Sequence, residues 1–218
     1  FNRYKKLRIP RPINYLFSGR IISERFKKIK RNNFLDNKNS IVGLSKGFKK
    51  KINFKIKNVF LVLISHPSET KLIFKWLSKI PNKNYYFIFR FPPSVKKKKF
   101  KNIINNEKNF TISKNNRLID DCRKSKYAIF SNTSAGLEAV NLGLVSIRIK
   151  TYNVNTSPLE KNHEKNFFCS SNFEDFKKNF YNLIKFNKKV YIKVHNSQYK
   201  ITKDMYSEFS PLNFKKAI

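Results

Sequence analysis

The sequence predicts an α/β fold in which a parallel sheet is covered by helices on both faces. From Val59 onward, short apolar runs alternate with segments whose apolar residues recur at helical spacing. The apolar runs, such as VFLVLI and YYFIF, are continuous, which is typical of strands buried on both faces. Because parallel strands are joined by right-handed crossovers, this alternation predicts a doubly wound, Rossmann-like domain over about Lys55–Asn187.

Local signals set where each element begins and ends. Pro81 breaks the first helical pattern, and Gly143 suits a helix end because glycine takes a positive φ at low cost. Asn172 suits a helix start, since its side chain can accept a hydrogen bond from the first turn. The expected strands are Val59–Ser65, Tyr85–Phe91, Phe110–Ser113, Tyr127–Ser131, Leu144–Lys150 and the segment FFCS at 167–170. The expected helices are Thr70–Ile80, part of 92–104, 116–125, 134–143 and Asn172–Phe186.

The first 54 residues do not fit inside this domain. They hold the strand-like segments NYLFSG and SIVGLS, separated by the helical pattern RIISERFKKIK, which indicates one strand–helix step of a preceding domain followed by a linker. The chain does not begin with Met, so we expect a fragment of a longer protein. The predicted division is 1–54 for the remnant and linker, 55–190 for the Rossmann-like domain, and 191–218 for a tail with short helices at best.

The composition favours anionic partners. Lys and Arg number 48 against 13 Asp and Glu, which gives a formal net charge of +35. The lysines are spread along the whole chain with many Asn, Ile and Phe residues, so AT-rich coding is the larger cause of the excess. The densest runs, Lys46–Lys51 and Lys96–Lys99, lack a pattern of interleaved aromatics for base stacking. They are interpreted as solvated loops, and a nucleic-acid partner is disfavoured.

Neither a membrane span nor a metal site is expected. No apolar run reaches the length of a spanning helix, about 18 residues or more. The two cysteines, Cys122 and Cys169, have no paired spacing, which indicates a reducing, cytoplasmic setting. The three histidines, His66, His163 and His195, form no metal-binding spacing. The basic excess then predicts a peripheral protein at anionic membrane surfaces, whose attraction falls as salt rises.

A small, polar segment, SNTSAGLEAVNLG (Ser131–Gly143), follows the fourth expected strand. In a doubly wound sheet, ligands bind beyond the carboxyl ends of the strands, where this segment begins. Its small residues let the backbone approach a ligand, and a helix N-terminus favours an anion such as phosphate. Glu138, about one turn into the helix, can accept hydrogen bonds from the vicinal hydroxyls of a ribose or sugar. The same residues also fit ordinary helix capping, in which Glu138 is only a first-turn acid.

The order of several segments resembles GT-B glycosyltransferases of the surface-carbohydrate and capsule-polysaccharide type. SNTSAGLEAVNLGLVSIRI resembles their donor-binding segment, in which a small Ser/Thr/Gly loop and an EA pair follow the fourth strand of the C-terminal domain. LVLIS with HPSE resembles the first strand and its donor-side loop, and YYFIFRFPPS resembles a strand that ends in a basic His-Pro motif. LFSGR and SIVGLSKGF resemble the passage between the two domains. The resemblance covers about Asn14–Phe186.

The resemblance implies the C-terminal, donor-binding half of a metal-independent GT-B enzyme. Its substrate would be a nucleotide-sugar, no further cofactor is expected, and the acceptor would be a glycan or lipid-linked glycan at the inner face of the membrane. Glu138 would bind hydroxyls of the donor sugar or ribose, with Ser65 and His66 on the facing loop. No catalytic base is assigned, because in many such enzymes it lies in the N-terminal domain. The residues implied to hold the donor phosphates are Asn132, Thr133, Ser134, Gly136 and Arg90.

Two positions depart from the family pattern, and several alternatives stay open. RFPPS carries Pro92 where relatives often have His, and no proline follows Gly143. A UDP-sugar 2-epimerase or a glycerophosphate transferase would use the same scaffold with a similar loop and acid. A basic nucleic-acid-binding module and a non-catalytic subunit are the alternatives outside this group of enzymes.

Overall fold

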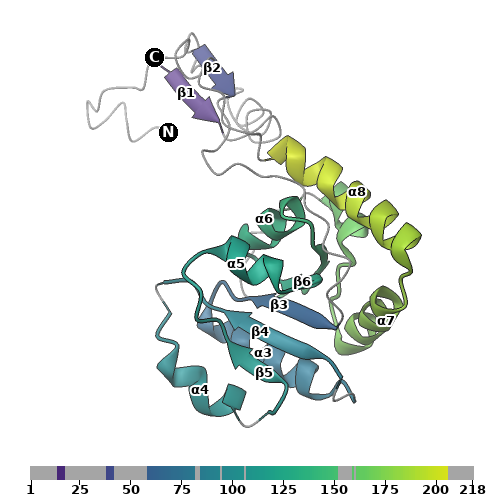
Figure 1. Cartoon of the computed structure of the whole chain (residues 1–218). Coiled ribbons are helices and arrows are strands. Elements are labelled where there is room, and N and C mark those ends of the chain that lie inside the picture. Colours follow the sequence, from purple (N-terminus) through teal and green to yellow (C-terminus); the bar gives the residue numbers. More distant parts are fainter. Residues whose placement is uncertain are drawn as a thin grey trace, which may run out of the picture. The chain divides into compact units, whose positions relative to one another are not determined.

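The computed structural model describes residues 14–17, 38–41, 58–81, 84–93, 95–105, 107–151, 159 and 161–205 (Figure 1). The chain divides into two compact units, one formed by Phe1–Phe48 with Lys203–Ile218 and the other by Lys49–Thr202. In the smaller unit, β1 (Asn14–Phe17) and β2 (Lys38–Ile41) pair in parallel. These strands overlap the two strand-like segments predicted there. The helix expected at 20–30 lies outside the described residues.

The larger unit contains a five-stranded parallel sheet with the strand order β5-β4-β3-β6-β7. The chain builds outward from β3 to β5 and then returns to the other side of β3, so the strand order reverses between β3 and β6. This is a doubly wound sheet, and the predicted fold class is confirmed. The strands are β3 (Val59–Leu63), β4 (Tyr86–Arg90), β5 (Phe110–Ile112), β6 (Tyr127–Phe130) and β7 (Val145–Arg148).

Helices cover both faces of this sheet, as continuous apolar strands require (Figure 1). α3 and α7 pack together on one face, and α6 contacts β6 and β7 on the other. α8 contacts the backbone of Ser146 in β7 through the Gln198 amide. The helices are α3 (Pro67–Ser78), α4 (Lys98–Asn105), α5 (Leu118–Arg123), α6 (Ala135–Asn141), the 3₁₀ helix η1 (Lys161–Phe167), α7 (Phe173–Ile184) and α8 (Lys188–Met205).

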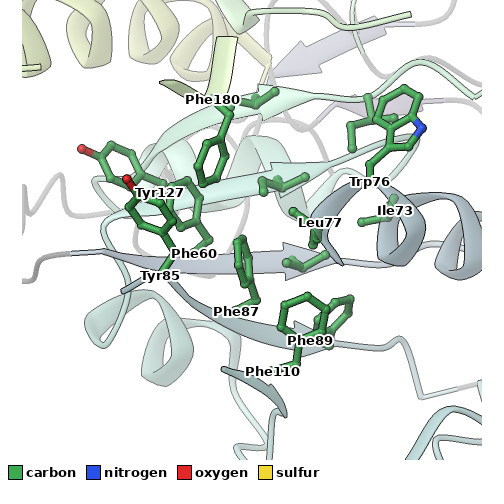
Figure 2. Close-up of a cluster of buried hydrophobic side chains, with 14 of the residues drawn as sticks. Phe60, Ile73, Trp76, Leu77, Tyr85, Phe87, Phe89, Phe110, Tyr127 and Phe180 are labelled. Carbon is green, nitrogen blue, oxygen red and sulfur yellow. The ribbon is translucent and has the colours of Figure 1, made fainter. Parts of the chain in front are cut away.

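The main core lies between the sheet and the helices α3 and α7, and it is built largely from aromatic rings (Figure 2). Each strand contributes every second residue to this face, so Phe60 lies beside Phe87 with ring centroids 5.4 Å apart. Phe180 of α7 stacks on Phe60 at 4.7 Å, and Trp76 of α3 packs against Phe176 at 5.6 Å. The Phe-rich composition is therefore used to fix the helix layer on the sheet.

The helix α3 begins three residues earlier than its apolar pattern predicts. Pro67 occupies the first turn, where a missing N–H has no intrahelical partner to lose. His66 is the N-cap, and its side chain accepts a hydrogen bond from the N–H of Ser68. The Glu69 side chain accepts from the N–H of His66 at 3.3 Å, which completes a capping box. The start of α3 is therefore set by its capping residues, which the spacing of apolar residues does not reveal.

Two predicted helix ends are confirmed. Gly143, just after α6, has a φ of 103°, a left-handed conformation that glycine adopts without a side-chain clash. Asn172 caps α7, because its Oδ1 accepts from the N–H of Asp175 at 2.8 Å.

The sixth strand predicted at FFCS is wrong. Only Ser170 of that segment pairs with the sheet, through an isolated parallel bridge to Ile149. A side chain completes the neighbouring part of the β7 edge. The Gln198 amide accepts from the N–H of Ser146 and donates to the carbonyl of Ser146, both at 2.8 Å. Because this amide takes the place of a strand backbone, both polar groups of the edge residue are paired without a sixth strand.

The helix α8 is longer than the short helices expected after residue 190. It spans 18 residues, and its inward positions are Tyr191, His195, Gln198 and Thr202, all fully buried. Three of these four are polar, so hydrophobic spacing does not reveal the helix. His195 Nε2 donates to the Val140 carbonyl at 2.8 Å. The larger unit therefore continues to Thr202, and the predicted boundary at 190 falls inside α8.

Candidate functional site

A pocket of about 410 Å³ opens at the carboxyl ends of β3 and β4, beside the start of α6. This is the edge of a doubly wound sheet where ligands bind, and the volume suits a small-molecule site. Phe91, Pro92, Pro93 and Leu118 contribute apolar lining. The polar lining consists of Arg90, Lys97, Asn115, Asn116, Thr133 and Glu138. Three of the predicted site residues, Arg90, Thr133 and Glu138, are therefore brought together.

The other predicted site residues lie outside the lining of this pocket. Ser65 and His66 follow β3, and Asn132 follows β6; all three belong to a second polar cluster beside the same sheet edge. Ser134 is exposed at the start of α6. Gly136 is buried two residues further on and packs against the sheet.

A buried carboxylate that the sequence reasoning missed joins the loops after β3 and β6. Glu69, in the first turn of α3, is only 2% exposed. Its Oε1 accepts from Ser131 Oγ at 2.5 Å and from Asn132 Nδ2 at 3.1 Å. Its Oε2 accepts from the Ser65 hydroxyl and from the Ser65 N–H at 3.2 Å. Glu69 therefore ties two loops together where the strand order reverses.

Hydrogen bonding keeps Glu69 ionised. Burial alone would raise its pKa, but the hydrogen bonds from the Ser131 and Ser65 hydroxyls and from the N–H groups of Ser65 and His66 lower the pKa below its usual 4.5. The sequence does carry a signal for this residue. HPSE places Glu69 three residues after an N-cap position, which is the capping-box spacing.

Arg148 extends this polar cluster to the end of β7. It is 4% exposed, and its Nε donates to the Ser131 carbonyl at 3.2 Å. Its Nη1 lies 2.8 Å from Glu164 of η1, and Lys150 Nζ lies 2.5 Å from the other Glu164 oxygen. Burial would raise the pKa of Glu164, but the hydrogen bonds and charges of Lys150 and Arg148 lower it. These ion pairs hold the end of β7 beside the loop after β6.

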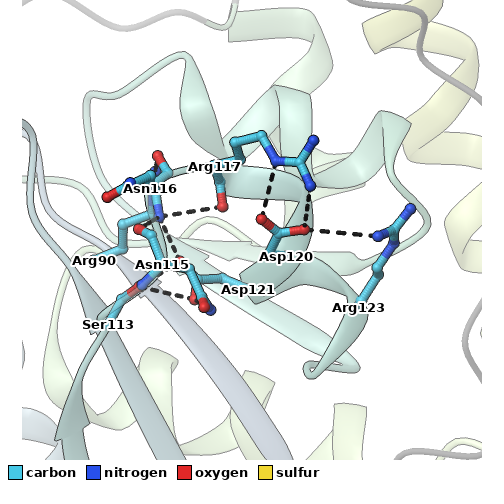
Figure 3. A network of polar contacts seen from close by, with 8 residues as sticks. All are labelled: Arg90, Ser113, Asn115, Asn116, Arg117, Asp120, Asp121 and Arg123. Atoms are coloured by element: carbon cyan, nitrogen blue, oxygen red, sulfur yellow. Dashed lines mark hydrogen bonds and ion pairs between the residues drawn. The ribbon is translucent and has the colours of Figure 1, made fainter.

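The Arg90 guanidinium is held by the start of α5 and the loop before it (Figure 3). It donates to Asp121 Oδ2 at 2.6 Å and to the carbonyls of Asn115 and Asn116 at 2.9 and 2.7 Å. Asp121 is fully buried and also accepts from Ser113 Oγ at 2.7 and 2.8 Å. Arg90 therefore neutralises a buried charge and fixes the loop that lines the pocket, in addition to lining the pocket itself.

Gly136 has a packing role. A Cβ atom built on it would lie 2.1 Å from Cγ of Phe130, much closer than side chains tolerate. Its N–H donates to the Thr133 carbonyl at 3.3 Å, and the N–H of Ala135 donates to Thr133 Oγ1 at 3.2 Å. Glycine therefore lets α6 approach β6, and the first-turn N–H groups of Ala135 and Gly136 are used within the helix start.

Gly136→Ala is expected to lower the free energy of unfolding by about 1–3 kcal/mol, because overpacking against Phe130 exceeds the gain of about 1 kcal/mol in helix propensity. Urea denaturation measures this loss. In a Phe130→Leu background, which makes room for the methyl group, the same change should cost clearly less. An equal loss of stability in both backgrounds would show that packing against the Phe130 ring is not what requires glycine at position 136.

Neither cysteine is activated as a nucleophile. Burial, with a further contribution from the Asp121 charge, raises the pKa of the Cys122 thiol. Burial likewise raises the pKa of Cys169. Within the residues that the structure describes, no three His, Cys, Asp or Glu side chains are grouped to hold a metal ion. The same part of the chain contains no helix with the length and hydropathy of a membrane span.

Comparisons with known proteins bear on the fold. No protein-family model matches the chain, and no curated protein matches its sequence. Among solved structures, the chain is similar to TarM, with a TM-score of 0.59 and 14% identity over 89% of this chain and 41% of that one. It is also similar to a chain in the structure of accessory secretory protein 1, 2 and 3 from Streptococcus pneumoniae, with a TM-score of 0.54 and 10% identity over 92% and 41%. The chain thus spans about two-fifths of each of these proteins.

The catalytic domain of a cholesterol-α-glucosyltransferase from Helicobacter pylori also matches, at a TM-score of 0.47 and 14% identity over 66% of this chain and 97% of that one. Together with the observed strand order, the similarities to TarM and to the accessory secretory protein structure show that the chain has an α/β, Rossmann-like fold.

Proposed function

We propose that the chain is the donor-binding half of a glycosyltransferase that moves a sugar from a nucleotide-sugar to a glycan or lipid-linked surface-carbohydrate acceptor. The observation that carries this proposal is the pocket at the carboxyl ends of β3 and β4. It combines an apolar wall with Thr133, Glu138 and Lys97 on a Rossmann-like fold, in a chain whose segment order resembles GT-B glycosyltransferases. Each of these features matches one part of a nucleotide-sugar.

Glu138 is assigned to the hydroxyl groups of the donor. It is half-buried, lies about one turn into α6 and lines the pocket. A carboxylate in this position accepts two charge-assisted hydrogen bonds from the vicinal hydroxyls of a ribose or sugar. The apolar lining, which includes Pro92 and Leu118, offers a surface on which a planar base can lie.

The donor phosphates are assigned to Thr133 and Lys97, with Ser134 exposed at the same helix start. Thr133 offers a hydroxyl, and Lys97 offers an ammonium group that offsets phosphate charge as the nucleotide leaves. Arg90 lines the same pocket, but it already donates to a carboxylate and to backbone carbonyls. We therefore assign Arg90 mainly to holding the pocket loop. Ser65, His66 and Asn132 are assigned to shaping the facing loops through Glu69.

Glu138→Ala is expected to weaken nucleotide-sugar binding by about ten- to several-hundred-fold, because it removes two charge-assisted hydrogen bonds to the hydroxyl pair of the donor. Calorimetric titration with a panel of uridine, guanosine, adenosine and cytidine nucleotide-sugars measures the affinity. A wild-type chain that binds no member of this panel would overturn the proposal as a whole.

Glu174→Ala is the matched control, since Glu174 is an exposed acid in the first turn of α7. Both variants should lose about 0.3–1 kcal/mol of stability, which is the usual contribution of an acid near a helix start. Only Glu138→Ala should lose nucleotide affinity. If its affinity equals that of wild type, Glu138 is a helix-terminus acid and has no role in donor binding.

A further inference from the structure

A dense cluster of lysines lies just before α4 and in its first turn. Five of the six residues from Lys96 to Lys101 are lysines, and no other six-residue stretch of the chain holds as many. All five side chains are exposed. We refer to Lys96, Lys97, Lys98, Lys99 and Lys101 as the α4 lysine cluster.

The cluster lies on a helix that packs against the core. Phe100 is 7% exposed and Ile104 is fully buried, so both anchor α4 to the core. The ring of Phe100 stacks on Phe91 with centroids 5.2 Å apart and an interplanar angle of 12°. The interpretation of Lys96–Lys99 as a solvated loop is therefore wrong for its second half, which forms the first turn of α4. The buried residues hold the lysines outward as a group.

The charge of the cluster is not offset by acids of its own segment. Residues 91–106 contain no Asp or Glu, and the first acid afterwards is Glu107. Other helices of this unit carry acids of their own, such as Asp120 in α5 and Glu174 in α7. A concentrated and locally uncompensated positive surface attracts an anionic partner.

We propose that the α4 lysine cluster is a docking surface for anionic lipid headgroups. Two features favour a membrane over a nucleic acid. Residues 91–106 contain no arginine, the side chain suited to bidentate phosphate recognition, and the aromatic ring of Phe100 is buried and cannot stack on bases. Ile103, 36% exposed on the same helix, adds an apolar contact at the headgroup level. This inference does not depend on the proposed sugar transfer.

The contact is electrostatic and superficial. Because Phe100 and Ile104 belong to the core, α4 has no free apolar face to insert into the bilayer. Each lysine near an anionic surface strengthens binding by about fivefold, and the attraction falls off over about 8 Å at physiological salt. Since Lys97 also lines the pocket, docking would bring the membrane surface next to it.

The test is sedimentation of the full chain with phosphatidylcholine vesicles that contain or lack phosphatidylserine. The test variant changes Lys96, Lys98, Lys99 and Lys101 to Gln and keeps Lys97, which the proposed donor site uses. The matched control changes four exposed lysines of α8 to Gln: Lys188, Lys189, Lys193 and Lys200. Both variants lose the same charge, so only its place on the surface differs.

The α4 variant is expected to bind the anionic vesicles at least about thirtyfold more weakly than wild type, and the α8 variant no more than about threefold. Thermal unfolding should be unchanged for both, since exposed lysines contribute little to stability. Equal losses in the two variants, undiminished binding by the α4 variant, or equal wild-type binding to vesicles without phosphatidylserine would overturn the proposal. If the α4 variant loses more affinity for duplex DNA than for anionic vesicles, the surface binds nucleic acid, and this result would also overturn the proposal.

Discussion

Arg90→Met is expected to lower the free energy of unfolding by about 3–5 kcal/mol. Arg90 Nη1 lies 2.6 Å from Asp121 Oδ2, and the Asp121 side chain is 1% exposed. Without the guanidinium, the side-chain donors that this buried carboxylate keeps among the described residues are the Ser113 hydroxyl and the Asn115 amide. The loop carbonyls that accept from Arg90 lose their donor as well. Urea denaturation followed by the fluorescence of Trp76, the one tryptophan, measures the change.

A second Arg–Asp pair on the same helix start is the matched control. Arg117 Nε lies 3.1 Å from Asp120 Oδ2, but these side chains are 73% and 27% exposed. Arg117→Met should therefore cost less than about 1 kcal/mol. Combining Arg90→Met with Asp121→Asn should cost clearly less than the sum of the two single changes, because the unpaired charge is gone. Equal losses for Arg90→Met and Arg117→Met would contradict a buried structural pair.

Glu69→Gln is expected to lower the free energy of unfolding by about 2–4 kcal/mol at neutral pH. The carboxylate accepts from two hydroxyls and from the N–H groups of Ser65 and His66. Hydroxyls can rotate, but the two backbone N–H groups cannot. A glutamine therefore either turns its NH₂ group toward fixed donors or takes the Glu69 acceptor oxygen away from Ser131 and Asn132.

The loss of unfolding free energy caused by Glu69→Gln should depend on pH. Because the folded-state pKa of Glu69 lies below its usual 4.5, the stability that ionisation contributes is complete above about pH 4.5. This contribution is lost as the pH falls through the lower folded-state pKa. The difference in unfolding free energy between wild type and variant should thus be constant from neutral pH down to about 4.5 and shrink below it. A difference that stays constant at lower pH would show that the carboxylate charge does not matter here.

The layer structure could be predicted because burial on both faces leaves a mark in the sequence. Strands such as VFLVL and YAIF are continuously apolar, and the segments between them have helical spacing. All five strands of the larger sheet fall within the predicted ranges. The predicted FFCS strand fails for a reason that local sequence does not contain. The edge it would have paired with is completed by Gln198, 52 residues after Ser146.

The candidate site could be predicted in part. The position of the segment after β6 follows from the fold rule for doubly wound sheets, and the pocket does contain Thr133 and Glu138. The ion pair between Arg90 and Asp121 could not be predicted, because Asp121 lies 31 residues later, in a helix that carries no recognisable sequence motif. Arg148 was missed because a single arginine in an apolar strand reads as a break in the pattern. Its partner Glu164 lies in a different element.

The most direct test of the donor-site account is to locate where a nucleotide binds. Amide chemical shifts of the isotopically labelled chain would be followed during titration with the tightest-binding nucleotide-sugar of the panel. The account predicts the largest shifts at Asn116, Leu118, Thr133 and Glu138, which line the pocket, and none at Lys178 in α7. Saturable shifts centred on any other part of the chain would contradict it.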